Sequence, residues 1–356
     1  EMDFFFFSFP PRSIDSLDFL NLSTSKKKKQ ESARAANWAR GLASIAKARA
    51  ELGEANANAS AASAASTSTS SADPPTREDE KTLLDFYSER ASALASGLGA
   101  PRKVASTALT FLRRFYSRHS ALEHDPKDAM LSAVYVAAKA EESYVSADRL
   151  AAAAGAGAAG GSAGLLRREP LMLQALEFDL LVYLPHRALE GFWADVGAAR
   201  VEAKREKRKG NNKNEASPLI GETLATAPAK TLSVARKASL GACDVLMRSD
   251  ACLLFPPGQI ALAAMRSGLK KAGVQGGLPR EFLERAVSRA ATAGGGGGGG
   301  GGKDEAEKAS SSLISSLEES LKFLDALGAA AAVSPTPDAA RAADARVRTA
   351  RSSLAA

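Results

Sequence analysis

The 356-residue chain has 45% hydrophobic and 24% charged residues, a composition that excludes a chain disordered throughout its length. Its 47 Lys and Arg outnumber its 40 Asp and Glu, and the formal net charge of +7 raises the question of a polyanionic partner. Two cysteines are too few for a disulfide framework or a four-cysteine zinc site, and no run of about 18 apolar residues predicts a membrane span.

The first predicted elements lie in an N-terminal region, residues 1–75. An amphipathic helix is expected over 31–52, followed by an uncharged linker rich in Ala, Ser, Thr and Asn that we expect to be disordered. Thr76 and Asp79 then form a pattern similar to a capping box, with Asp in place of Glu. A helix is therefore expected from this point to about Ser96.

The next segments predict four more helices. Pro101 opens the first, and Asp125-Pro126 opens a second that reaches Ala140 and is apolar nearly all round. A helix that is apolar on every side is expected at the centre of a bundle. The remaining segments are a short helix capped by Ser146 over 147–154, a Gly/Ala loop over 155–164, and a helix over 166–182.

The second half of the chain repeats this pattern after a basic loop. Each half has a helix, a short linker, a Pro start and then a helix rich in small residues, which indicates an internal repeat of a five-helix unit. With no convincing strand, the predicted fold is all-α. The expected segments are the loop 202–218, helices over 232–248, 259–269, 279–291 and 311–327, a glycine run over 294–302, and a last polar helix over 338–353.

Catalytic and cofactor motifs do not emerge from these residues. The glycine spacing from Gly155 to Gly160 follows a helix rather than a strand, and the run Gly294–Gly302 has no Lys-Ser/Thr after it, so neither predicts a nucleotide site. The three histidines look scattered, and both cysteines are interpreted as small buried hydrophobes. We expect no enzyme activity, no cofactor and no metal.

Two charged residues stand in apolar surroundings. Lys139 ends the helix that follows Pro126, and Glu169 precedes Pro170 at the start of an apolar helix. Each has a simple structural explanation, because a cation near a helix C-terminus and an anion near an N-terminus both interact favourably with the helix dipole. On the residues alone, that explanation is favoured over a functional one.

Several segments resemble the cyclin box. The first-box resemblance rests on Arg113-Arg114-Phe115-Tyr116, Asp125-Pro126, Ala137-Ala138-Lys139-Ala140-Glu141-Glu142 and Leu176-Glu177-Phe178-Asp179-Leu180. The segment Leu253–Leu262 resembles the second cyclin box, and Leu184–Asp195 is similar to the inter-box segment of the cyclin H subfamily. The resemblance covers roughly residues 80–290 and, more weakly, 31–52 and 311–350. Insertions at 155–164 and 202–218 interrupt it, and the glycine run at 294–302 separates the last two helices of the second box.

The resemblance implies two tandem five-helix cyclin boxes with flanking N- and C-terminal helices. The expected division is a first box at 76–185, an inter-box segment with the basic insertion at 186–231, a second box interrupted by the glycine run at 232–328, and a helical tail at 329–356.

It also implies a function: a non-catalytic regulatory subunit that binds and activates a cyclin-dependent kinase, of the CDK-activating kinase or TFIIH kinase-module type. Implied partners are the kinase catalytic subunit, an assembly factor and the TFIIH core. In the family, a Lys ending the third helix and a Glu opening the fifth bind the kinase, and Lys139 and Glu169 match them. Met172, Leu173 and Leu176 are candidates for the apolar part of that interface.

Two basic runs remain to be interpreted. They are expected to be solvated loops that bind no specific nucleic acid. The alternative is that they act as nuclear import signals, which would suit a nuclear protein. The alternatives for function are another transcriptional cyclin similar to cyclin C, and a cyclin-fold DNA- or TBP-binding factor similar to TFIIB. The basic residues are Lys26, Lys27, Lys28 and Lys29 in the first run and Lys204, Arg205, Lys207, Arg208 and Lys209 in the second.

Overall fold

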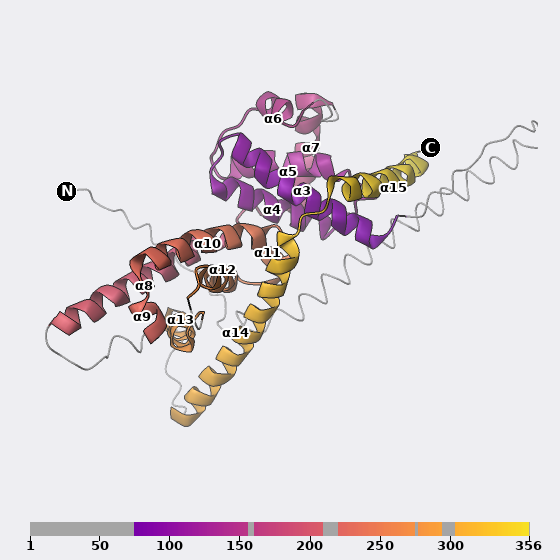
Figure 1. The fold of residues 1–356 in the computed structure, drawn as a ribbon. Coiled ribbons are helices and arrows are strands. Elements are labelled where there is room, and N and C mark those ends of the chain that lie inside the picture. The colour runs from indigo at the N-terminus through magenta and orange to yellow at the C-terminus, as the bar shows by residue number, and fades with distance from the viewer. Residues whose placement is uncertain (1–74, 156–159, 209–219, 275–276, 294–302, 356) are drawn as a thin grey trace, which may run out of the picture. The chain divides into compact units, whose positions relative to one another are not determined.

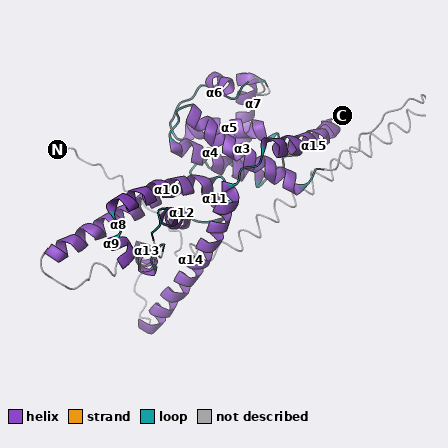
Figure 2. Cartoon of the chain, viewed as in Figure 1, coloured by secondary structure: helices purple, strands orange, loops and turns teal. Residues whose placement is uncertain are grey.

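The computed structural model describes residues 75–155, 160–208, 220–274, 277–293 and 303–355. Every regular element in these ranges is an α-helix, which confirms the predicted all-α class (Figure 2). The helix expected over 31–52 lies outside the described residues. The described chain forms two compact units, one from 75–185, 243–257 and 326–355, and the other from 186–242 and 258–325.

The first unit begins with α3 (Arg77–Gly97), and its capping box is present as expected. The Thr76 hydroxyl accepts a hydrogen bond from the Asp79 backbone N–H at 3.2 Å, and the Asp79 carboxylate accepts one from the Thr76 N–H at 2.8 Å. Two of the N–H groups left unpaired at the helix start are thereby satisfied, so the sequence sets where α3 begins.

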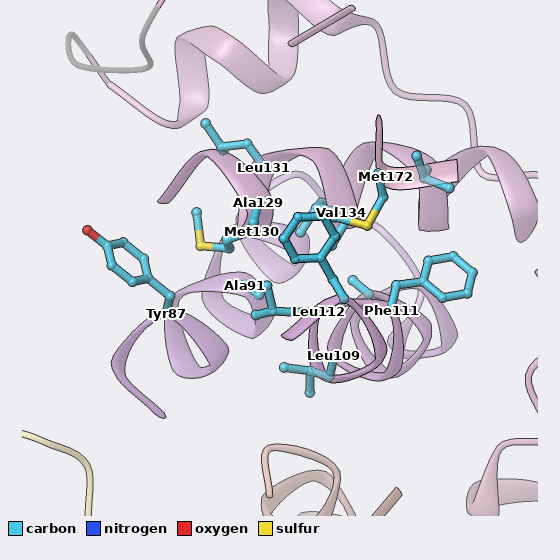
Figure 3. Close-up of a cluster of buried hydrophobic side chains, with 14 of the residues drawn as sticks. Tyr87, Ala91, Leu109, Phe111, Leu112, Ala129, Met130, Leu131, Val134 and Met172 are labelled. Carbon is cyan, nitrogen blue, oxygen red and sulfur yellow. The ribbon is translucent and has the colours of Figure 1, made fainter. Parts of the chain in front are cut away.

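The core of this unit forms around α5 (Pro126–Ala140), which packs against α3, α4 (Arg102–Tyr116), α6 (Ala147–Ala153) and α7 (Gly161–Ala175). Its apolar character on all sides therefore places it at the centre, as predicted (Figure 1). Figure 3 shows side chains from four of these helices meeting in one cluster, among them Tyr87, Leu109, Phe111, Met130, Val134 and Met172.

The helix expected over 166–182 is displaced toward the N-terminus. α7 begins at Gly161, inside the expected loop 155–164, and ends at Ala175. At its end Glu177 adopts a left-handed φ of 53°, the Glu177 N–H donates to Gln174 O at 2.9 Å, and the Phe178 N–H donates to Leu173 O at 3.0 Å. This is a Schellman ending built without glycine.

A buried charged cluster joins α3 and α4 to the segment around α11 (Ala251–Leu254). The Arg113 side chain is only 3% exposed; its guanidinium lies 2.7 Å from the Asp85 carboxylate and 3.2 Å from the Asp250 carboxylate. It also donates to the Ser88 hydroxyl at 3.2 Å and to the Arg248 carbonyl. This cluster connects residues far apart in sequence.

The C-terminal helix α15 (Pro337–Ala355) packs on α3 in the same unit. Arg346 pairs with Asp79, and Arg351 lies 2.9 Å from Asp125. Its inward face is made of small or β-branched residues: Ala340, Ala343, Val347 and Ala350.

The second unit also consists of helices. The prediction of a basic loop over 202–218 is wrong for its first residues, because α8 continues through Arg208. Residues 198–208 contain good helix formers and no Gly or Pro, so propensity carries the helix onward. The helices with most of their length in this unit are α8 (Pro185–Arg208), α9 (Glu222–Thr226), α10 (Ala229–Met247), α12 (Pro257–Lys271), α13 (Arg280–Ala293) and α14 (Lys303–Ala332).

α10 and α12 approach each other closely at a glycine. A Cβ on Gly268 would lie 2.0 Å from Ser239 Oγ and 2.5 Å from the Ala235 carbonyl oxygen. The missing side chain therefore permits the contact.

Candidate partner-docking site

Lys139 lies in the last turn of α5. Its Nζ sits 4.4 Å from the centroid of the Tyr135 ring, one turn earlier on the same helix. The ring is buried, and its face attracts the ammonium group. The position near the helix C-terminus also favours a cation, as the sequence suggests.

Glu169 does not occupy the first turn of its helix. It lies roughly two turns beyond Gly161, so the N-terminal dipole explanation fails for this residue. Its carboxylate Oε1 instead accepts a hydrogen bond from Lys139 Nζ at 2.7 Å. The structure thus brings together two residues separated by 30 positions, both singled out by the sequence.

This ion pair lies at the surface of the first unit. The Lys139 side chain is 48% exposed and the Glu169 side chain 18% exposed. The hydrogen bond to Glu169 raises the pKa of Lys139, so the ammonium form persists at neutral pH. Because the Lys139 ammonium is half-exposed, water screens the pair, which should contribute about 1 kcal/mol to stability, and the Lys139 charge remains available to another molecule.

A second ion pair fixes α7 across α5. Arg168, beside Glu169 in sequence, lies 2.8 Å from Asp128 in the first turn of α5. Asp128 and Lys139 are about 16 Å apart along the helix axis, at 1.5 Å per residue. Arg168 and Glu169, adjacent on α7, therefore pair with opposite ends of α5. These two contacts set how α7 lies on that helix.

The C-terminal end of α5 is held by α4. Glu141 accepts a hydrogen bond from the Thr107 hydroxyl at 2.6 Å, and its backbone carbonyl accepts one from Lys103 Nζ at 2.7 Å. Glu142 then takes a left-handed φ of 53°. Lys139 is thus presented from a helix end fixed at several points, so little ordering is required before docking.

Two of the three predicted apolar interface residues are not at the surface. Met172 is 1% and Leu176 4% exposed, and both belong to the core cluster, while Leu173 is half-buried. The phase of α7 explains this correction, because packing on α5 turns Met172 inward. Sequence reasoning missed the exposed Leu166, three residues before Glu169 and hence on the same helical face.

The histidines are not all scattered, in contrast to the sequence interpretation. His119, Glu123 and His124 each offer a ligand atom, and these atoms lie within 4.8 Å of one another. Burial, together with the neighbouring His119, lowers the pKa of His124, which favours the neutral ring. A His-x3-Glu-His spacing across a tight turn is the signal that could have revealed this cluster.

The basic runs are only partly described. Lys204 and Arg205 are exposed on α8, and Lys207 and Arg208 end that helix, whereas Lys209 and residues 26–29 lie outside the described ranges. Among the described residues, no helix combines the length and apolar character needed to cross a membrane.

Comparison with known proteins decides the family. The sequence model of the cyclin N-terminal domain matches residues 94–181, and that of the cyclin C-terminal domain matches residues 184–320. The chain belongs to the cyclin family. In this cyclin, α8 lies inside the C-terminal match, although the sequence suggested an inter-box segment over 186–231. The box boundaries 76–185 and 232–328 stay predictions.

Relatives of this cyclin include cyclin H proteins. Cyclin-H1-1 of Arabidopsis thaliana is 35% identical over 193 residues, which cover 54% of this chain and 50% of that protein. Cyclin-H of Xenopus laevis is 31% identical over 198 residues, covering 55% and 51%. The chain thus spans about half the length of these relatives. The cyclin C alternative fits no better, since Cyclin-C1-2 of Arabidopsis thaliana is 34% identical over only 125 residues.

A solved structure shares the fold. A chain in the structure of the CAK complex from Chaetomium thermophilum bound to ATP-γ-S has a TM-score of 0.58 with this cyclin. The similarity covers 96% of this chain and 86% of the other, at 18% sequence identity. At this identity the likeness supports the fold.

Proposed function

We propose that this cyclin binds and activates a cyclin-dependent kinase, as the regulatory subunit of a kinase of the CDK-activating or TFIIH type. The observation that carries the proposal is the Lys139–Glu169 pair at the surface of the first unit, which two core helices hold at 2.7 Å with the Lys139 side chain half-exposed. The cyclin contributes no catalytic group; it acts on the kinase through docking.

The mechanism is selection of one kinase conformation. An active protein kinase pairs the Glu of its αC helix with a Lys on strand β3, and this pair positions the ATP phosphates. A rigid surface that binds the inward position of αC shifts the kinase toward that state. To raise the population of the active state from 1% to 99%, the cyclin must bind that state about 5.5 kcal/mol more tightly than the inactive one. The ion pairs Lys139–Glu169 and Arg168–Asp128 hold α7 on α5, so this surface needs little reordering to bind the inward position of αC.

The charge pair sets the register of docking. In the free cyclin, each charge neutralises the other, so neither is left unpaired near the apolar core. In the complex, Lys139 and Glu169 would also engage polar groups of the kinase. Leu166 on the same face of α7 provides apolar area, and Leu173 at its half-buried edge provides more.

The wider assignment follows from the relatives. An assembly factor and the TFIIH core are proposed partners, and nuclear residence and a role in RNA polymerase II transcription and cell-cycle control go with them. Lys204 and Arg205, exposed at the end of α8, are candidate contacts for nuclear import.

The test is capture of the partner followed by reconstitution. The full chain, immobilised in source lysate, is expected to retain a cyclin-dependent kinase that it activates when the two are recombined. The double substitution Lys139→Ala/Glu169→Ala is expected to abolish activation while circular dichroism stays unchanged; Lys127→Ala, a basic residue in the first turn of α5, is the control. Full activation by the double variant would overturn the assigned surface.

A DNA-binding measurement tests the TFIIB-like alternative. Tight binding of a DNA duplex with a steep salt dependence, and no kinase recovered from the lysate, would favour a DNA-binding factor over a kinase activator.

A further inference from the structure

The turn between α4 and α5 carries a cluster that docking does not use. The His119 and His124 rings lie edge to face with centroids 4.9 Å apart, and both pack on Phe115 at 4.6 and 5.3 Å. His119 Nδ1 lies 3.9 Å from Glu123 Oε2. Two imidazoles and one carboxylate thus point ligand atoms toward a common space.

The backbone of this turn is fixed before any ligand arrives. The buried Glu80 of α3 accepts hydrogen bonds from the Ser120 hydroxyl at 3.1 Å and from the Ala121 N–H at 2.7 Å. The Tyr116 hydroxyl donates to the His124 carbonyl at 3.0 Å. Because these contacts hold the turn at both ends, the cluster is preorganised, which is the main requirement for a ligand site.

A cavity lies beside the cluster. About 230 Å³ of space opens next to Glu123 and His124, and Asp128 and Ser132 of α5 line it. The Ser132 hydroxyl is buried and, within the described residues, makes no hydrogen bond. Such a group indicates that water or another ligand fills the space.

We propose that His119, Glu123 and His124 bind a divalent transition-metal ion of the zinc class. Neutral imidazole nitrogens and a carboxylate oxygen are ligands that Zn²⁺ accepts, at about 2.0–2.2 Å. Tetrahedral geometry at these lengths separates two ligand atoms by about 3.4 Å. His119 Nδ1 and Glu123 Oε2 lie 3.9 Å apart and all three ligand atoms lie within 4.8 Å of one another, so side-chain rotations must bring them closer around the ion.

The cavity supplies room for the remaining coordination positions. Water molecules in it would complete the shell and hydrogen-bond to the Ser132 hydroxyl. The bound ion would join both ends of the α4–α5 turn, so its binding free energy would add to the stability of the first unit. The site does not depend on the proposed kinase partner.

The experiment uses the full chain, purified without a histidine tag and freed of metal by a chelator. Isothermal titration with Zn²⁺ and the visible absorption of the Co²⁺ form report on binding and on the ligand set. We expect one equivalent of Zn²⁺, a higher melting temperature, and Co²⁺ bands typical of low coordination number.

Three variants and one control separate this site from incidental binding. His119→Phe keeps a ring on Phe115, and Glu123→Gln keeps an acceptor for the Ser120 N–H, so both preserve the local packing. Each is expected to weaken Zn²⁺ binding at least about tenfold. His124→Ala should do the same, whereas His186→Ala on α8, which removes the third histidine, should change nothing.

The folding of every variant is checked by circular dichroism. Should His124→Ala fail to fold, the outcome rests on Glu123→Gln, whose side chain is exposed. Binding by His119→Phe and Glu123→Gln equal to that of the unmodified chain overturns the site, and so does a chain that takes up no Zn²⁺ at micromolar concentration.

Discussion

Two charged groupings on the same bundle differ in how deeply their cations are buried. The Arg113 guanidinium is buried between two carboxylates, while the Lys139–Glu169 pair has similar geometry but lies at the surface. Around Arg113, burial alone would lower the pKa, and the carboxylates of Asp250 and Asp85 overcome it and raise the pKa. Lys139 gains its raised pKa mainly from one hydrogen bond. Burial of the cation, more than distance, separates the Arg113 cluster from the proposed docking pair.

This difference has a consequence for mutagenesis. Water can replace the partner of an exposed charge, but it cannot easily reach a buried one. Substitutions at Arg113 should therefore change stability, and substitutions at Lys139 or Glu169 should change partner binding.

The largest effect is expected at the buried cluster. Arg113→Ala should lower the free energy of unfolding by about 3 kcal/mol, because it removes a buried guanidinium together with its ion pairs to Asp85 and Asp250 and its hydrogen bond to the Arg248 carbonyl. Urea denaturation measures the change. The neighbouring Arg114→Ala, whose side chain is partly exposed, is the control and should cost less than about 1 kcal/mol. Equal losses for both variants would mean that the burial of Arg113 does not add to its contribution to stability.

Met172→Ala tests the core beneath the docking surface. The side chain is almost fully buried, so its truncation should lower the free energy of unfolding by about 3 kcal/mol through the cavity it leaves. Kinase activation measured at a temperature where the variant is folded should be retained. Loss of activation with unchanged stability would instead restore Met172 to the interface expected from the sequence.

Arg346→Ala probes a case between buried and exposed. Burial would raise the pKa of Asp79, but hydrogen bonds from Arg346 and Thr76 outweigh it and lower that pKa. A lowered carboxyl pKa stabilises the fold above the unfolded value of about 3.9, and this contribution is lost as pH falls through the folded pKa. The free energy of unfolding of the variant should be lower by about 1–2 kcal/mol at pH 7.

The pH series provides the check. Denaturation of both proteins between pH 7 and pH 3 should show the difference shrinking as Asp79 becomes protonated. Arg341→Ala, whose ion pair with Asp338 is fully at the surface, is the control. A difference independent of pH would show that Arg346 acts through packing and not through its charge.

The sequence could predict the features that depend on local chemistry. The capping box of Thr76 and Asp79 starts α3, and the all-round apolar pattern of α5 places that helix at the centre. Both residues of the docking pair were singled out, although the dipole explanation for Glu169 is wrong. Local patterns sufficed here because neighbouring residues supply the deciding interactions.

Features set by distant contacts could not be predicted in the same way. The inward direction of Met172 depends on how α7 crosses α5. The histidine cluster depends on a turn that Glu80 holds from another helix. Each required knowledge of a partner far away in sequence.

The central claim is that the Lys139–Glu169 pair serves docking more than folding. The exchange Lys139→Glu/Glu169→Lys tests it directly, because it keeps an ion pair between α5 and α7 but reverses the charges that a kinase meets. The free energy of unfolding should fall by no more than about 2 kcal/mol, from the dipole cost of an anion at the end of α5 and the loss of the contact between the Lys139 ammonium and the Tyr135 ring.

Kinase activation by this exchanged variant is the deciding measurement. We expect the activity of the captured kinase to fall to the level seen without cyclin, at a temperature where the exchanged variant is fully folded. Full activation by the exchanged variant would contradict the account, since it would mean that the pair only holds α5 and α7 together.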